Sequence, residues 1–202
     1  GHDNYKRYRD LAEKKIKISF NSPVILGFTL FSLVALLLAQ VTGGGTNDLF
    51  FSVYRAPLTD PLTWVRFFGH VFGHAGWQHF IGNIMLILVI GPLLEEKYGS
   101  GEVLFVILIT AFVTGLLNFA LFPQVQLLGA SGVAFALILL SSFVSVKEGE
   151  IPLTFLLVAV IYIGGEVING IFIRDSVSNL SHIAGGAVGA VLGVGLCGRK
   201  LK

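Results

Sequence analysis

The fold is decided by residues 102–121, which read EVLFVILITAFVTGLLNFAL and carry one charged side chain, Glu102. An α-helix needs about 20 predominantly apolar residues to cross the ~30 Å hydrocarbon core of a bilayer, so this stretch predicts a membrane-spanning helix. Three of the other apolar segments are shorter than a full crossing, which is tolerated where neighbouring protein or a water-filled cavity covers the missing turn. Together with 102–121, the chain has five further apolar segments, at roughly 23–41, 79–94, 131–146, 152–171 and 181–197.

The composition of the whole chain agrees with this interpretation. Of 202 residues, 54% are hydrophobic and 13% are charged, and the mean hydropathy is +0.80. Soluble domains carry about 25% charged residues. A net charge of +2 and a single cysteine exclude a disordered chain and an internally disulfide-bonded scaffold. We therefore predict an all-α, polytopic membrane protein built as a bundle of six transmembrane helices.

Most of the positive charge lies in the two termini. An even number of spans places both termini on one side of the membrane, and the positive-inside rule predicts that this side is the cytoplasm. Basic clusters that flank apolar segments have this role in membrane proteins, so we expect no nucleic-acid partner. The terminal basic residues are Lys6, Arg7, Arg9, Lys14, Lys15, Lys17, Arg199, Lys200 and Lys202.

These patterns divide the chain into a basic, amphipathic, cytoplasmic lead-in at 1–22, a six-span membrane domain at 23–198 and a basic tail at 199–202. The long external loop expected at 42–78 is rich in Phe and Trp, so we expect it to lie partly in the membrane interface as amphipathic structure. Gly1-His2 stands where a Met would start a chain, which suggests a truncation or a cleaved tag.

Polar side chains stand at the predicted outer ends of the second, fourth and sixth segments. The second begins with His79 and Asn83, whose i, i+4 spacing places them on one helix face. The fourth begins at Ser131 and the sixth at Ser181-His182. Even-numbered spans run in the same direction, so these ends share one face of the membrane. Because polar groups inside a span are costly, they are candidates for a functional site.

The side chains at this face have the chemistry of nucleophilic catalysis. A serine hydroxyl is a weak nucleophile until a base takes its proton, and His182 is the base available to Ser131. Ser131 begins a helix within the glycine-containing motif 129–132, which leaves backbone N–H groups free to bind a developing oxyanion. His79 and Asn83 would supply further donors. No acidic residue adjoins these motifs, so we predict a Ser–His dyad.

The sixth segment continues with glycines at every fourth position, Gly185, Gly189 and Gly193. This spacing lets another helix approach closely, and the fourth segment offers a small face through Gly132 and Ala136. Close packing of these two segments would bring Ser131 and His182 within hydrogen-bond reach, about 3 Å.

Taken in order, the motifs resemble the rhomboid family of intramembrane serine proteases, specifically its bacterial six-span type. The resemblance covers about residues 64–195. Its elements are Trp64-Val65-Arg66, His79-x3-Asn83, Glu95 with Gly99-Ser100, Gly129-x-Ser131-Gly132, and His182-x2-Gly185-x3-Gly189.

The resemblance implies an endopeptidase that cleaves transmembrane protein substrates in the lipid bilayer, near its outer face, without a cofactor or a metal. It implies Ser131 as the nucleophile, His182 as the base, and the Ser131 N–H, His79 and Asn83 as the oxyanion hole. It also implies a multi-pass protein of the bacterial inner membrane. The residues expected to support the site are Gly129, Gly132, Phe135, Gly185, Gly189, Arg66 and His74.

Three positions depart from the family pattern. Phe135 stands where the family often has a Tyr that packs on the catalytic histidine, Val65 separates the Trp and Arg of the first loop, and Ser181 replaces a common Ala. None of these changes removes a catalytic group. We expect His74 to bond backbone and hold the first loop, and the same role suits Arg66.

Other interpretations remain open. Gly-Ala-Ser-Gly in a single span is also typical of a helix-packing patch. His70, His74 and His79 resemble a metal cluster, but the glutamate base of a zinc protease motif is missing. Glu166, inside the fifth segment, either lines a substrate entry or has a structural role. The competing functions are a non-catalytic rhomboid-like protein that binds membrane helices and, less favoured, a small transporter. The residues identify neither a particular substrate nor an oligomeric state.

Overall fold

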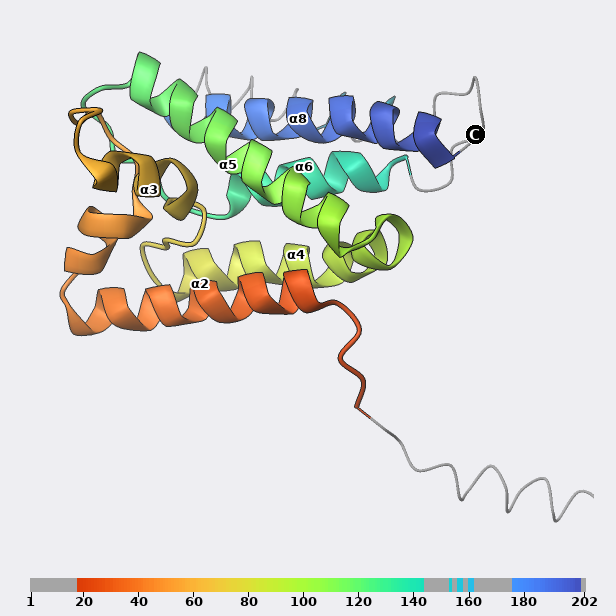
Figure 1. The fold of residues 1–202 in the computed structure, drawn as a ribbon, viewed down its shortest axis with the longest axis horizontal. Coiled ribbons are helices and arrows are strands. Elements are labelled where there is room, and N and C mark those ends of the chain that lie inside the picture. The colour runs from red at the N-terminus through yellow and green to blue at the C-terminus, as the bar shows by residue number, and fades with distance from the viewer. Residues whose placement is uncertain (1–17, 144–152, 154–155, 158–159, 162–175, 201–202) are drawn as a thin grey trace, which may run out of the picture.

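The computed structural model describes residues 18–143 and 176–200, with the positions 153, 156–157 and 160–161 between them. All regular elements in this part of the chain are helices (Figure 1). They are α2 (Pro23–Val41), the π-helical turn η1 (Asn47–Phe51), α3 (Pro61–Gly69), α4 (Trp77–Tyr98), α5 (Ser100–Leu121), α6 (Ser131–Ser141) and α8 (Ser176–Lys200).

Among the described residues, three helices are long and apolar enough to cross a membrane, namely α2, α4 and α5. The apolar part of α8, Leu180–Leu196, and the helix α6, Ser131–Ser141, are shorter. Most of the predicted fifth span, 152–171, lies outside the described residues. The chain therefore has the all-helical architecture of an integral membrane protein, and the number of six spans stays a prediction.

The observed helix bounds differ from the predicted ones by a few residues in four helices: α4 spans 77–98, α5 spans 100–121, α6 spans 131–141 and α8 spans 176–200. Helix α4 begins at Trp77, two residues inside the loop expected at 42–78, because Gly76 precedes it in an extended conformation with φ of 176°. Helix α6 ends at Ser141 rather than near residue 146, and a turn follows it. The loop between α2 and α4 contains η1 and α3, and α3 exposes Trp64, about half of whose surface is accessible, while it buries Phe67.

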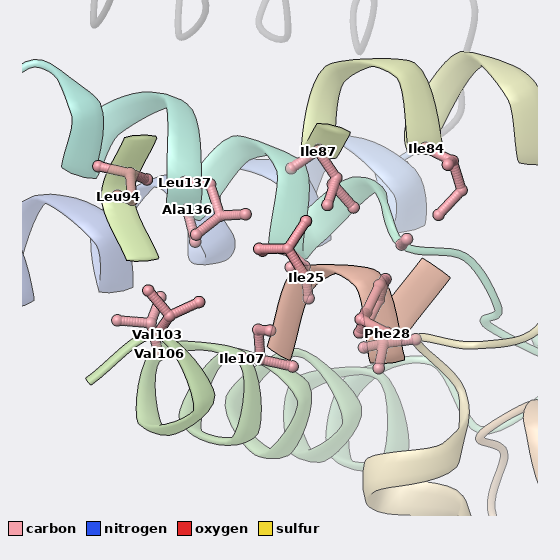
Figure 2. Close-up of a cluster of buried hydrophobic side chains, with 14 of the residues drawn as sticks. Ile25, Phe28, Ile84, Ile87, Leu94, Val103, Val106, Ile107, Ala136 and Leu137 are labelled. Carbon is pink, nitrogen blue, oxygen red and sulfur yellow. The ribbon is translucent and has the colours of Figure 1, made fainter. Parts of the chain in front are cut away.

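The helices form two pairs, α2 with α4 and α6 with α8, which meet through α4 and α6 and are both contacted by α5 (Figure 1). Helices α2 and α4 lie side by side, α6 packs against α8 and α4, and α5 crosses the bundle to contact both pairs. Their apolar side chains meet in one core (Figure 2). The labelled members of this core are Ile25, Phe28, Ile84, Ile87, Leu94, Val103, Val106, Ile107, Ala136 and Leu137.

Helices α6 and α8 make the closest contact in the bundle. A Cβ added at Gly185 would collide with the backbone of Gly132, and one at Gly189 would collide with the backbone of Ala136. Lipid tails are as apolar as Leu, so helix association in a bilayer depends on such close packing more than on the hydrophobic effect. The glycines therefore set the distance between α6 and α8.

At the opposite end from Trp77, the carboxylate of Glu95 joins three helices. It is 4% exposed and accepts hydrogen bonds from the backbone N–H groups of Val24 (2.9 Å) and Ile25 (3.0 Å). It also accepts one from Ser100 Oγ, at 2.7 Å. The first N–H groups of a helix have no partner within the helix, and Glu95 of α4 satisfies two of them for α2.

Candidate functional site

Ser131 is the first residue of α6, and the loop before it is held in an unusual conformation. Gly129 has φ of +133°, which an L side chain rarely adopts. A Cβ at Gly129 would also lie 2.9 Å from the ring of His79. Glycine is therefore required here for two reasons, and its absence of a side chain lets His79 approach the backbone that leads into Ser131.

His182 belongs to α8 and packs against the face of α6 that carries Ser131. Its ring is stacked on the ring of Phe135, with centroids 4.4 Å apart and planes 8° from parallel. Phe135 follows Ser131 by four residues, so the two share one side of the helix. Next to them, a Cβ on Gly132 would lie 3.7 Å from the backbone oxygen of Ser181. Both Ser131 and His182 are half-buried.

His79 and Asn83 approach the same loop from the first turns of α4. The N–H of Ala75 donates to Nδ1 of His79 at 3.4 Å, so in the neutral ring the proton is on Nε2. Asn83 is 8% exposed, and its Nδ2 has no hydrogen-bond partner within the described residues. This Nδ2 lies 3.8 Å from the position of a Cβ on Gly129. An unused buried donor is rare in a folded protein and calls for an explanation.

His70 and His74 belong to the loop before α4, and both attach it to other elements. The carbonyl oxygen of His70 accepts from the N–H of Gly129 (2.9 Å), and Nε2 of His74 accepts from the N–H of Ala130 (3.4 Å). Nδ1 of His74 donates to the carbonyl oxygen of Phe72 at 3.1 Å. Burial lowers the pKa of His70 and of His74 to about 4, and the nearby His79 contributes to the shift of His74.

Arg66 holds the same loop from within α3. It is 5% exposed, and its Nε donates to the carbonyl oxygen of Leu49 at 3.0 Å. Its guanidinium lies over the ring of Tyr54, 4.7 Å from the centroid, and 3.7 Å from a carboxylate oxygen of Asp60. These contacts fold the segment from η1 to α3 into one unit.

Sequence reasoning missed the role of Asn118, which lies on α5. Its Nδ2 donates to the carbonyl oxygens of Val53 and Val125, both at 3.0 Å. Val53 also pairs with Leu127 through two backbone hydrogen bonds of 2.9 and 3.0 Å. Asn118 therefore joins the loop before α3 to the loop before Ser131. The available signal was a buried amide in an otherwise apolar span.

The histidines do not form a metal site in the part of the chain that the structure describes, where no group of three or more His, Cys, Asp or Glu side chains could hold an ion. Nε2 of His70 bonds the carbonyl oxygen of Ala111 at 2.9 Å, and both ring nitrogens of His74 bond backbone groups. Glu166, the other candidate from the sequence, lies outside the described residues.

The chain has long apolar helices, and its polar side chains gather at the starts of α4 and α6 and on the neighbouring part of α8. These features define the class of protein as a helical membrane protein with a polar site between its helices. The family follows from comparison with known proteins. A family model described as "Rhomboid domain" matches residues 61–199, and the chain belongs to the rhomboid family.

Three relatives illustrate the range of this similarity. Rhomboid-related protein 1 of Caenorhabditis elegans is 32% identical over 63% of this chain and 38% of its own length. Rhomboid protease GlpG of Serratia proteamaculans is 26% identical over 84% of this chain and 61% of its own. Rhomboid protease GluP of Bacillus subtilis is 25% identical over 78% of this chain and 32% of its own. The chain thus spans between about a third and three fifths of the length of these relatives.

Proposed function

We propose that the chain is an intramembrane serine endopeptidase that cleaves transmembrane segments near the outer membrane face, with both of its own termini in the cytoplasm. The observation that carries the proposal is the stacking of His182 on Phe135, because it brings an imidazole to the side of α6 on which Ser131 stands. Two relatives that are named rhomboid proteases add support.

In the proposed reaction, Ser131 Oγ attacks the carbonyl carbon of the scissile peptide bond while His182 takes the hydroxyl proton. The carbonyl oxygen becomes an oxyanion. His182 then gives the proton to the departing amine, and an acyl-enzyme on Ser131 remains. A water molecule attacks this ester, again with His182 as base, which releases the new carboxyl group and restores the serine hydroxyl.

Three donors are proposed to bind the oxyanion. The N–H of Ser131 is one of the first N–H groups of α6, which lack partners within the helix. Nε2 of His79 carries a proton when the ring is neutral, and Nδ2 of Asn83 is a buried donor without a partner in the described residues. An oxyanion that develops at the start of α6 would use both side chains. This explains why the resting structure tolerates an unsatisfied amide.

Cleavage of a membrane helix in reconstituted vesicles tests the proposal. Wild-type protein is incubated with a panel of single-span peptides, and the products are identified by mass spectrometry. We expect cleavage near one end of the span, and its loss in Ser131→Ala and His182→Ala. Ser141→Ala is the matched control, because this serine of the same helix bonds the carbonyl oxygen of Ile138 at 2.6 Å.

The alternative function makes a different prediction in the same experiment. A non-catalytic rhomboid-like protein would bind peptides of the panel, detected by co-purification, and leave all of them intact. If folded wild-type protein binds the peptides without cleaving them, the function is therefore that of a membrane-helix binder and not that of a protease.

A further inference from the structure

Both ring nitrogens of His74 bond backbone groups whose roles are fixed. The carbonyl group of Phe72 can only accept, so Nδ1 of His74 must carry the proton. The N–H of Ala130 can only donate, so Nε2 must be unprotonated. These two bonds together require a neutral imidazole in the Nδ1–H form. This is the opposite of His79, whose Nδ1 is the accepting atom.

The bond to Ala130 lies next to the proposed nucleophile. Ala130 is the N-cap residue of α6 and directly precedes Ser131. The N–H of Gly129 donates to the carbonyl oxygen of His70, so two consecutive backbone donors of this loop bind the turn from His70 to His74. If Nε2 of His74 carried a proton, this N–H and the N–H of Ala130 would be two donors facing each other, and the hydrogen bond between His74 and Ala130 would break.

We propose that neutral His74 is a positioning residue that holds Ala130, and through it Ser131, in place for attack, and that protonation of its Nε2 releases this link and reversibly inactivates the site. The proton enters from solvent and no covalent bond is made or broken. This inference rests on the proposed function only in taking Ser131 as the nucleophile. The contacts of His74 themselves do not depend on it.

The surroundings of His74 set the pH at which this release occurs. His74 is 1% exposed, and the titratable group that faces it is His79 on α4, with ring centroids 5.0 Å apart. His182 lies close enough to His79 to act on it electrostatically, and no carboxylate of the described residues acts on His74. Burial and the charge of His79 lower the pKa of His74 to about 4, so the link is intact at neutral pH and is lost in acid.

The first test measures the rate at which a fluorophosphonate labels Ser131, from neutral pH to below the pKa of about 4. Acid slows labelling in every variant, because a protonated His182 cannot take the hydroxyl proton of Ser131. In wild type we expect protonation of His74 to add a further fall of about tenfold per pH unit below its pKa of about 4, and the rate to recover at neutral pH. His74→Gln places an amide oxygen near the position of Nε2, where it can accept from Ala130 without titrating. This variant should keep labelling at neutral pH and lose the further fall, while the effect of His182 remains.

Two further variants make the test specific. His74→Phe keeps a ring but removes the acceptor. It should label about tenfold more slowly than wild type at neutral pH, and the difference should shrink in acid, where wild type loses the same link. His70→Gln is the matched control, because His70 is equally buried, but its ring bonds Ala111 rather than the loop before Ser131. This control should keep the further fall that is due to His74. Tryptophan fluorescence checks that each sample is folded. A rate of folded His74→Gln that falls as steeply as that of wild type below a pH of about 4 would overturn the proposal.

A second test needs no activity. In the Ser131→Ala protein with ¹⁵N-labelled histidine, NMR should show His74 in the Nδ1–H form and His79 in the Nε2–H form, with the His74 signals assigned by their loss in His74→Gln. An Nε2–H form of His74, or titration at the ordinary pKa of about 6.5, would overturn the proposal whether or not Ser131 reacts. Absence of labelling in folded wild type, with the NMR result as expected, would instead contradict the proposed protease.

Discussion

At the scale of single residues, Asn83 separates a catalytic role from a structural one. Its Nδ2 is buried and has no partner in the described part of the chain, so Asn83→Ala removes little that stabilises the resting protein. An oxyanion donor, in contrast, contributes about 10²–10³ to kcat. We therefore expect kcat to fall by this factor while the thermal midpoint stays close to that of wild type. Peptide cleavage and thermal unfolding in detergent measure the two quantities. Loss of stability without loss of kcat would assign Asn83 to packing.

The sequence predicted the polar side chains of the candidate site, but it did not predict the backbone contacts that hold the loop before Ser131. Ser131, His182, His79 and Asn83 were singled out because polar groups in apolar spans are conspicuous, and the structure brings His79 and Asn83 to the loop before Ser131. The connection through Val53 and Leu127 has no such signal, because it consists of backbone hydrogen bonds that any side chain allows.

At the scale of elements, the contact of α6 with α8 depends on glycine. Gly189→Val would place side-chain atoms in the backbone of Ala136, and overpacking of this kind costs about 1–3 kcal/mol or more. Gly195→Val on the same helix is the control, since nothing lies within 4 Å of a Cβ there. We expect Gly189→Val to lower the midpoint of unfolding strongly and the control to change it little. Equal effects would mean that helix propensity, not packing, limits α8.

The attachment of α2 to α4 depends on Glu95 in the same way. Glu95→Ala would leave the N–H groups of Val24 and Ile25 without their acceptor, at a cost of about 1–3 kcal/mol for each buried group. Glu96→Ala changes the neighbouring carboxylate, which is exposed, and should have little effect. Unfolding curves of the two variants in detergent make the comparison, and similar midpoints would show that Glu95 does not stabilise α2.

The sequence predicted the positions of the long helices better than it predicted the end of α6 and the turn η1. The second and third spans were expected at 79–94 and 102–121, and α4 and α5 cover both, because long apolar runs leave few alternatives. The end of α6 at Ser141 was missed, since Phe143, Val144 and Val146 continue the apolar pattern of the sequence while the backbone already turns at Ser142. The turn η1 likewise has no distinct sequence signature.

At the scale of the whole molecule, the buried histidines link stability to pH. Folding lowers the pKa of His70 and His74 from 6.5 to about 4, so between these values the unfolded chain binds more protons than the folded one. The free energy of unfolding should be highest above pH 6.5, fall as the pH falls toward about 4, and stop changing through these groups below that. Each of the two histidines accounts for on the order of 3 kcal/mol of this fall in the free energy of unfolding.

Unfolding midpoints across this range, compared with those of His70→Gln/His74→Gln, measure the effect. The double variant should be less stable at neutral pH and show a much flatter dependence on acid. A dependence as steep as that of wild type would place the responsible groups elsewhere in the chain.

The claim that organises the site is that His182 activates Ser131. The most direct test is treatment of the folded, purified protein with a fluorophosphonate, followed by peptide mapping, for wild type, Ser131→Ala and His182→Ala. We expect one adduct in wild type, on Ser131, and none in either variant. No adduct in folded wild type with this reagent or a second serine-reactive class, or an adduct that survives in Ser131→Ala, would contradict the claim.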